Sequence, residues 1–116
     1  MAETKVTPNE MKNAILSQTN TGTGGGTMYY INLGGLKLLW GKSDVHSAAV
    51  NSAFGITFPS GFFTTVHSGT ISVSDMSIYG MQADFVNAPD TTGVSYYHAN
   101  YTGTASMVVN YLIIGV

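Results

Sequence analysis

Apolar residues recur at every second position over most of the chain after residue 27, which is the spacing of β-strands. A Gly34-Gly35 pair lies between the first two alternating runs, and such a pair is typical of a two-residue hairpin turn. The segments that read as strands are residues 28–33, 36–40, 54–58, 70–74, 81–85, 94–97 and 108–114. The pattern predicts an all-β fold in which six to eight short antiparallel strands pack as a β-sandwich.

The last of these segments, residues 108–114, is apolar on both faces of the expected strand. Such a run indicates a central strand that is covered on both sides. A strand this apolar would invite aggregation if it were left open to solvent. Burial within one sandwich or burial at a subunit interface would each shield this strand from solvent, and we expect an oligomer.

The first 27 residues follow a different pattern, which predicts a short helix and then a linker. Residues 7–10, Thr-Pro-Asn-Glu, form a capping box with proline at the first helical position. Apolar residues follow at helical spacing from Met11 to Ile15, so the helix is expected to end near Ser17. Residues 19–27 consist of Gly, Thr and one Asn, which is typical of a flexible linker.

These patterns divide the chain into two regions. Residues 1–27 form the helix and linker, and residues 28–116 form the β-sandwich domain. Within the domain, residues 44–53 lack a clear period and are expected to form a loop or at most one helical turn.

Composition narrows the range of partners. Only 9% of the residues are charged, there is no arginine, and the net charge is −2, so the chain offers no basic surface for nucleic acid. It has no cysteine, which excludes disulfides and thiolate metal sites. The polar N-terminus does not resemble a signal peptide, and no apolar run has the length that crosses a bilayer. We therefore expect no membrane insertion.

Residues that carry chemistry are few and scattered. Neither a Gly-x-Ser-x-Gly elbow nor a His-Glu-x-x-His motif occurs, so we predict that the protein is not an enzyme and uses no cofactor or metal. Two weaker alternatives stay open. Asp44 and His46 share one face of an extended segment and form a weak metal or acid–base pair. Asp75 and Asp84 could meet in space as the paired carboxylates of a glycan-hydrolysing spike.

Aromatic residues give the best candidates for a binding site. The chain has seven tyrosines and one tryptophan, and such side chains combine an apolar face with a polar group, which suits sugar stacking. We nominate Tyr79, Tyr97, His98 and Tyr101 as carbohydrate-binding or receptor-binding residues. For His98, a place in the core is as consistent with the pattern as a place on the surface.

Three segments carry a resemblance to a known family. They are Leu-Leu-Trp-Gly at residues 38–41, Phe-Gly-Ile-Thr-Phe-Pro-Ser-Gly-Phe at residues 54–62, and Thr-Thr-Gly-Val-Ser at residues 91–95 followed by Asn-Tyr-Leu-Ile-Ile-Gly-Val at residues 110–116. In order and spacing they resemble the C-terminal β-sandwich of bacteriophage tail fibres, which is similar in fold to H-type lectins. Val94 and Leu112 replace the Phe and Trp usual in that family, and both replacements are apolar.

The resemblance implies a partner and a location. It implies a parallel homotrimer at the distal end of a fibre, which joins the remainder of the phage tail and binds lipopolysaccharide, capsule or an outer-membrane protein. Such a chain is made in the host cytoplasm and is carried on the virion. Two alternatives remain: a lectin-like carbohydrate-binding protein of non-phage origin, and a structural trimerisation or decoration module of the virion.

Overall fold

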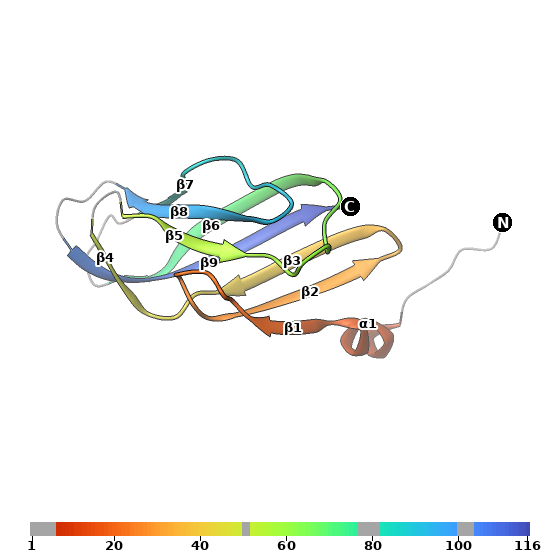
Figure 1. Ribbon diagram of the computed structural model, residues 1–116. Coiled ribbons are helices and arrows are strands. Elements are labelled where there is room, and N and C mark those ends of the chain that lie inside the picture. Colours follow the sequence, from red (N-terminus) through yellow and green to blue (C-terminus); the bar gives the residue numbers. More distant parts are fainter. Residues whose placement is uncertain (1–6, 50–51, 77–81, 100–103) are drawn as a thin grey trace.

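The computed structural model describes residues 7–49, 52–76, 82–99 and 104–116, which form a two-layered β-sandwich and one short helix. A six-stranded sheet and a three-stranded sheet lie one over the other, as Figure 1 shows. All strand pairs in the described residues are antiparallel. The predicted fold class is confirmed, with nine strands in the described part of the chain where six to eight were expected.

The large sheet is organised around the C-terminal strand. Its strands are β1 (Leu16–Thr19), β2 (Thr27–Leu33), β3 (Leu36–Lys42), β4 (His46–Ala49), β6 (Val66–Met76) and β9 (Thr104–Gly115). They follow the order β1-β2-β3-β9-β4, and β6 also pairs with β9. Residues 110–115 of β9 pair with both β3 and β6, so these two strands occupy opposite edges of β9. The central position predicted for this segment is confirmed.

The small sheet covers one face of the large one. Its strands β5 (Phe54–Thr57), β8 (Gly93–Ala99) and β7 (Gln82–Phe85) lie in the order β5-β8-β7. Alternate residues of both sheets point inward and form one core. The core includes Met28, Leu39, Ile56, Phe58, Phe63, Val94, Tyr96, Met107, Val109, Tyr111 and Ile113.

The β2–β3 hairpin turns at the predicted glycine pair. Gly34 and Gly35 have φ angles of 64° and 107°, a region that side chains with a Cβ rarely enter. Leu33 pairs directly with Leu36, so the turn contains two residues.

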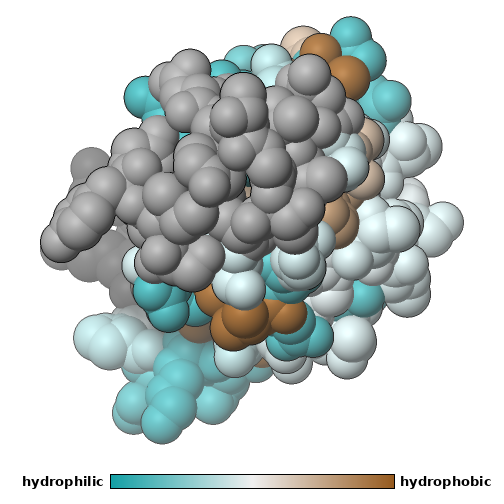
Figure 2. All heavy atoms as spheres, turned by 90° about the vertical axis from the view of Figure 1, so that its left-hand side faces the viewer, coloured by the Kyte–Doolittle hydropathy of each residue, from teal (hydrophilic) through white to brown (hydrophobic). Residues whose placement is uncertain are grey.

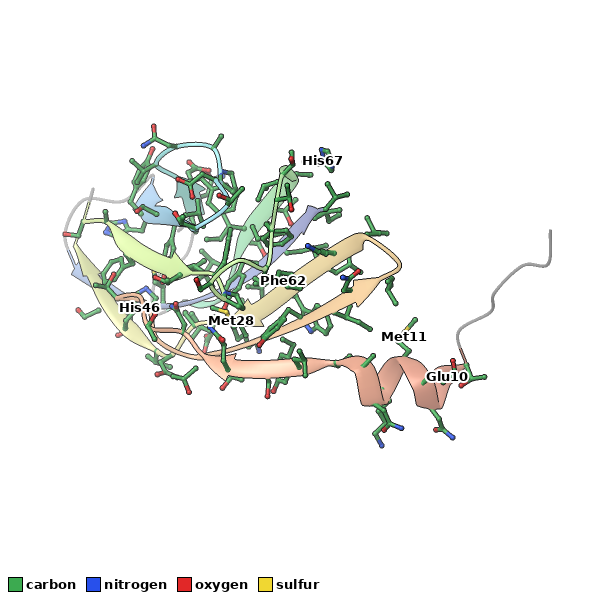
Figure 3. All side chains as sticks on the ribbon, turned by 45° about the vertical axis from the view of Figure 1, so that its right-hand side comes forward. Glu10, Met11, Met28, His46, Phe62 and His67 are labelled. Atoms are coloured by element: carbon green, nitrogen blue, oxygen red, sulfur yellow. The ribbon has the colours of Figure 1, made fainter. Side chains whose placement is uncertain are left out.

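The N-terminal helix is shorter than predicted. Helix α1 (Pro8–Ala14) is capped as expected, since the Thr7 hydroxyl accepts a hydrogen bond from the Glu10 amide at 3.2 Å. It ends at Ala14 rather than near Ser17, and residues 16–19 form β1 instead. A helix this short is marginal alone, whereas pairing with β2 provides a ladder of hydrogen bonds. None of the helical residues is buried, and Figure 3 shows Glu10 and Met11 beyond the edge of the sheets.

Two other segments differ from their predictions. Residues 46–49, expected within a loop, form β4 and pair with β9, because their backbone continues along the edge that β3 occupies. Residues 19–27, expected to be a flexible linker, instead form the end of β1, an ordered turn and the start of β2. The β structure therefore begins at Leu16 rather than at residue 28. Within the described residues, no helix is long and apolar enough to cross a membrane.

Asn20 holds this turn in place. It is only 5% exposed, and its amide nitrogen donates to the carbonyls of Gly25 at 3.3 Å and Gly55 at 3.0 Å. Its amide oxygen accepts from the backbone amides of Gly22 and Thr57, both at 2.9 Å. Because Gly55 and Thr57 belong to β5, one side chain joins the turn before β2 to the edge of the small sheet.

Replacing Asn20 with alanine removes these four bonds and leaves partly buried backbone groups without these partners. We expect Asn20→Ala to lower the free energy of unfolding by about 2–4 kcal/mol, measured by urea denaturation. Asn32→Ala is the control, because Asn32 is exposed and accepts a hydrogen bond from Gly35 in the hairpin turn. The control should cost less than about 1 kcal/mol. Equal losses in the two variants would contradict the role assigned to Asn20.

Candidate functional site

Two of the four residues nominated from the sequence lie in the described part of the chain, and they face opposite ways. Tyr97 is half-buried on the outer face of β8, whereas His98 is fully buried on the inner face. Consecutive residues of a strand point to opposite sides, which explains the difference. His98 therefore belongs to the core, one of the two places expected for it. Tyr79 and Tyr101 lie outside the described residues.

Tyr97 belongs to a polar surface on the outer side of the small sheet. Ser95 faces the same way on β8, about 7 Å along the strand. Asp84 of β7 lies opposite Tyr97 in the register, and Thr57 shares this face on β5. Thr57, Ser95 and Asp84 are exposed. The surface thus combines hydroxyl groups, a carboxylate and one aromatic ring.

A groove of about 360 Å³ opens at one end of this surface. It lies between residues 55–57 of β5, residues 93–95 of β8 and the turn at residues 87–92 that connects β7 to β8. Its polar side chains are Thr57, Asn87, Asp90, Thr92 and Ser95. The groove is therefore lined mainly by hydroxyl, amide and carboxylate groups.

Asp90 organises the turn that borders the groove. Its Oδ1 atom accepts from the Thr92 amide at 2.8 Å, the Thr92 hydroxyl at 2.7 Å and the Gly93 amide at 3.1 Å. These three hydrogen bonds lower the pKa of Asp90 below its usual value of 3.8, and the bond from the Thr92 hydroxyl has the largest effect. The carboxylate therefore stays ionised at neutral pH.

Gly93 allows β8 to approach β5 closely at the base of the groove. A Cβ at this position would lie 2.3 Å from the carbonyl oxygen of Ile56, a distance that real structures do not tolerate. The Phe58 amide donates to the Thr92 carbonyl at 2.9 Å and extends the contact beyond the end of β5. Backbone hydrogen bonds thus join the β5 side of the groove to the β8 side.

The charge around the groove is negative. Asp90 and Asp84 lie in or beside it, whereas the described lysines lie on α1 and β3, at Lys12, Lys37 and Lys42. Seen from one end, the described surface is mostly hydrophilic or neutral, with small hydrophobic areas (Figure 2). In the described part of the chain, no group of three or more His, Cys, Asp or Glu side chains gathers as a metal site would require. The groove suits a ligand that is rich in hydroxyl groups.

Asp44 and His46 were predicted to pair through their side chains, but His46 instead contacts the backbone of Asp44. The Nδ1 atom of His46 lies 2.8 Å from the backbone oxygen of Asp44, and its Nε2 atom lies 3.1 Å from the Tyr96 hydroxyl. A carbonyl oxygen only accepts, so Nδ1 carries the proton and Nε2 accepts from Tyr96. The His46 ring also packs against Phe54 at 4.5 Å, and it lies within the body of the molecule in Figure 3. Both ring nitrogens are engaged, so this histidine has a structural role.

The other candidate residues do not form a cluster. Asp75 lies on β6 of the large sheet and Asp84 on β7 of the small one. His67 is exposed at a register shift of β6, and Figure 3 shows it at the periphery. The groove, by contrast, gathers five polar side chains in one hollow.

The outer side of the large sheet has the opposite character, and we call it the outer apolar face. Tyr29, Trp40 and Leu112 form one cross-strand row, and the rings of Tyr29 and Trp40 stack at 6.1 Å. Leu112 is 37% exposed and Tyr29 is 42% exposed. The face consists of Tyr29, Ile31, Leu38, Trp40, Leu112 and Ile114. The small sheet packs on the opposite side, so no second sheet covers this face in the described structure, although Ile31 within it is only 3% exposed.

Comparisons with protein-family models, with curated proteins and with solved structures find no match for this chain. The site is therefore interpreted from its own geometry.

Sequence reasoning favoured aromatic residues and missed the polar residues of the groove. The side chains of the turn at residues 87–90 were not nominated for binding. A signal for them exists in Asp90-Thr-Thr-Gly93, because an aspartate two residues before a Thr-Gly pair favours a side-chain-capped turn. The meeting of this turn with β5, more than 30 residues earlier in the chain, is a tertiary contact that the sequence pattern does not encode.

The two tyrosines of the core predict a loss of stability at alkaline pH. Burial raises the pKa of Tyr96 and of Tyr111 from 10.0 to about 12. The unfolded chain therefore releases these protons near pH 10, before the folded chain does, and the free energy of unfolding falls as pH rises from 10 to 12. We expect a decrease of about 2 kcal/mol for each tyrosine, measured as the urea midpoint against pH.

Phenylalanine variants provide the control. Either substitution should reduce the alkaline decrease, and an unchanged pH dependence in both variants would contradict the assignment. At neutral pH the two variants should differ in their free energy of unfolding. Tyr96 donates a hydrogen bond to His46, whereas the buried Tyr111 hydroxyl has no partner among the described residues. We expect Tyr96→Phe to cost about 1 kcal/mol and Tyr111→Phe to be neutral or stabilising.

Proposed function

We propose that this chain is the receptor-binding tip domain of a bacteriophage tail fibre. In this role it forms a homotrimer, attaches the virion to a glycan or a protein of the bacterial surface, and catalyses no reaction. The observation that carries the proposal is the opposite character of the two outer sheet faces. The outer apolar face suits the joining of identical copies, and the polar face with its groove suits a hydrated receptor.

The segments behind the family resemblance support the proposal. Residues 38–41 lie in β3, and residues 54–62 comprise β5 and the turn that follows it. Residues 91–95 border the groove and begin β8, and residues 110–116 form most of β9. The segments that resemble the fibre family therefore contribute both to the sheet core and to the groove.

A carbohydrate-binding protein of non-phage origin is the second candidate. The groove favours it, because hydroxyl and carboxylate groups beside a tyrosine are suited to a sugar in any biological context. Attachment to bacterial cells that is blocked by purified surface glycan, together with competition against phage adsorption, would favour the fibre. Binding to glycans that bacteria do not display would favour the lectin.

Cell attachment tests the proposed function directly. Fluorescently labelled protein should stain some strains of a bacterial panel and leave others unstained, because receptor glycans and proteins differ between strains. A labelled unrelated protein of similar size is the control. Staining of no strain would contradict the proposal, and loss of capsule during incubation would contradict the absence of catalysis.

Self-association should depend on the outer apolar face. We expect a solution mass three times that of the 12.2 kDa chain, measured by light scattering. Leu112→Glu places a charge in this face and should shift the mass to that of a single chain, because an unpaired charge is costly to bury. Val86→Glu is the matched control, since Val86 is a similarly exposed aliphatic residue, at 45%, in the connection after β7 of the small sheet. A monomeric wild type, or equal effects of both variants, would contradict this assignment.

A further inference from the structure

The groove and its surroundings indicate the class of ligand that the proposed function requires, and the inference rests on that function. The volume of about 360 Å³ lies at the lower end of the range for small-molecule sites, which is roughly 300–1,000 Å³. A site of this size accommodates one or two sugar rings rather than a long segment of polymer. The groove is also open, as recognition of one unit within a larger glycan requires.

The negative charge of Asp90 in the groove disfavours acidic sugars. Asp90 is held ionised by its hydrogen bonds, and Asp84 lies beside Tyr97 on the adjoining surface. The described lysines lie on other elements, and the chain has no arginine. An acidic sugar, whether carboxylated or phosphorylated, would meet a carboxylate here and no described cation.

The hydrogen-bonding groups suit hydroxyls and amines. The three bonds that hold the turn all end on Oδ1 of Asp90, so they leave Oδ2 to accept from a ligand. The hydroxyls of Thr57 and Ser95 and the amide of Asn87 add donors and acceptors around the groove. Tyr97, about 7 Å from Ser95 along the same strand face, offers a ring on which the C–H face of a sugar can stack.

We propose that the groove, with Tyr97 at its border, is a subsite for a non-acidic sugar ring, either neutral or carrying a free amine. Asp90 has two roles in this subsite. Its Oδ1 atom fixes the turn, and its negative charge disfavours acidic sugars. Discrimination between bacterial surface glycans then depends on the charge of the terminal sugar.

The first experiment measures binding of the full chain to neutral, amino and acidic oligosaccharides by calorimetry and on a glycan array. We expect binding to neutral or amino sugars and at least tenfold weaker binding to their acidic counterparts. Ser95→Trp should abolish binding by filling the groove, whereas Ser60→Trp, in an exposed turn after β5, should bind as the wild type does. Preference for acidic sugars would overturn the proposal.

Three variants separate the contributions of charge and stacking. Asp90→Asn keeps an oxygen that can accept the three turn bonds but removes the charge, so it should improve binding of acidic sugars about fivefold with little effect on neutral ones. Tyr97→Ala should weaken binding about tenfold, and Tyr97→Phe should retain it, because stacking needs the ring alone. Unchanged selectivity in Asp90→Asn would overturn the role assigned to the charge.

Cell staining and sugar binding together test the groove as the receptor site separately from the proposed tip function. If labelled protein stains bacteria and Ser95→Trp stains them equally well, the tip function stands and the groove is not the receptor site. If the wild type binds neither cells nor any sugar, the proposed function and the proposed ligand class both fail. If staining disappears in Ser95→Trp and is blocked by neutral glycan, both are supported.

Discussion

The structure depends on one constraint, which is that β9 is paired along both edges and buried on the face that looks toward the small sheet. Its inward residues, including Val109, Tyr111 and Ile113, fill the core against the small sheet. Its edges are occupied by β3 with β4 on one side and by β6 on the other. Its outward residues Leu112 and Ile114 lie on the outer apolar face, which no second sheet of the described chain covers.

The strand pattern predicted most of the fold, because a period of two is a local property of the sequence. The hairpin at Gly34-Gly35, the cap at Thr7 and the central position of the last strand were all readable in this way. The errors fall where tertiary contact overrides local signal. Leu16, expected near the end of the helix, instead begins β1 and pairs with β2, and Asn20 converts a glycine-rich segment into a fixed turn by bonding to β5. Neither partner lies close in the sequence.

The candidate site was less predictable than the fold. Tyr97 could be nominated from its aromatic character, but its direction and that of His98 depend on the register of β8, which a one-residue shift would reverse. The groove arises from residues 55–57, 87–92 and 93–95, which only the small sheet brings together. Its opposite in chemical character, the outer apolar face, is built from the same kind of alternation. One pattern thus gives each sheet a face toward the core and an outer face of distinct chemical character.

The turn beside the groove separates the residues that hold its shape from the residues whose side chains are free to vary. Its shape is maintained by Asp90, Thr92 and Gly93 and by backbone bonds to Phe58, whereas the side chains at positions 87, 88 and 91 are exposed and take no part in those bonds. Positions 87 and 88 line the groove, so substitutions there alter what the groove presents and leave the three turn bonds to Asp90 in place. Under the proposed function, receptor specificity is therefore open to change through a few surface positions while the sandwich continues to fold.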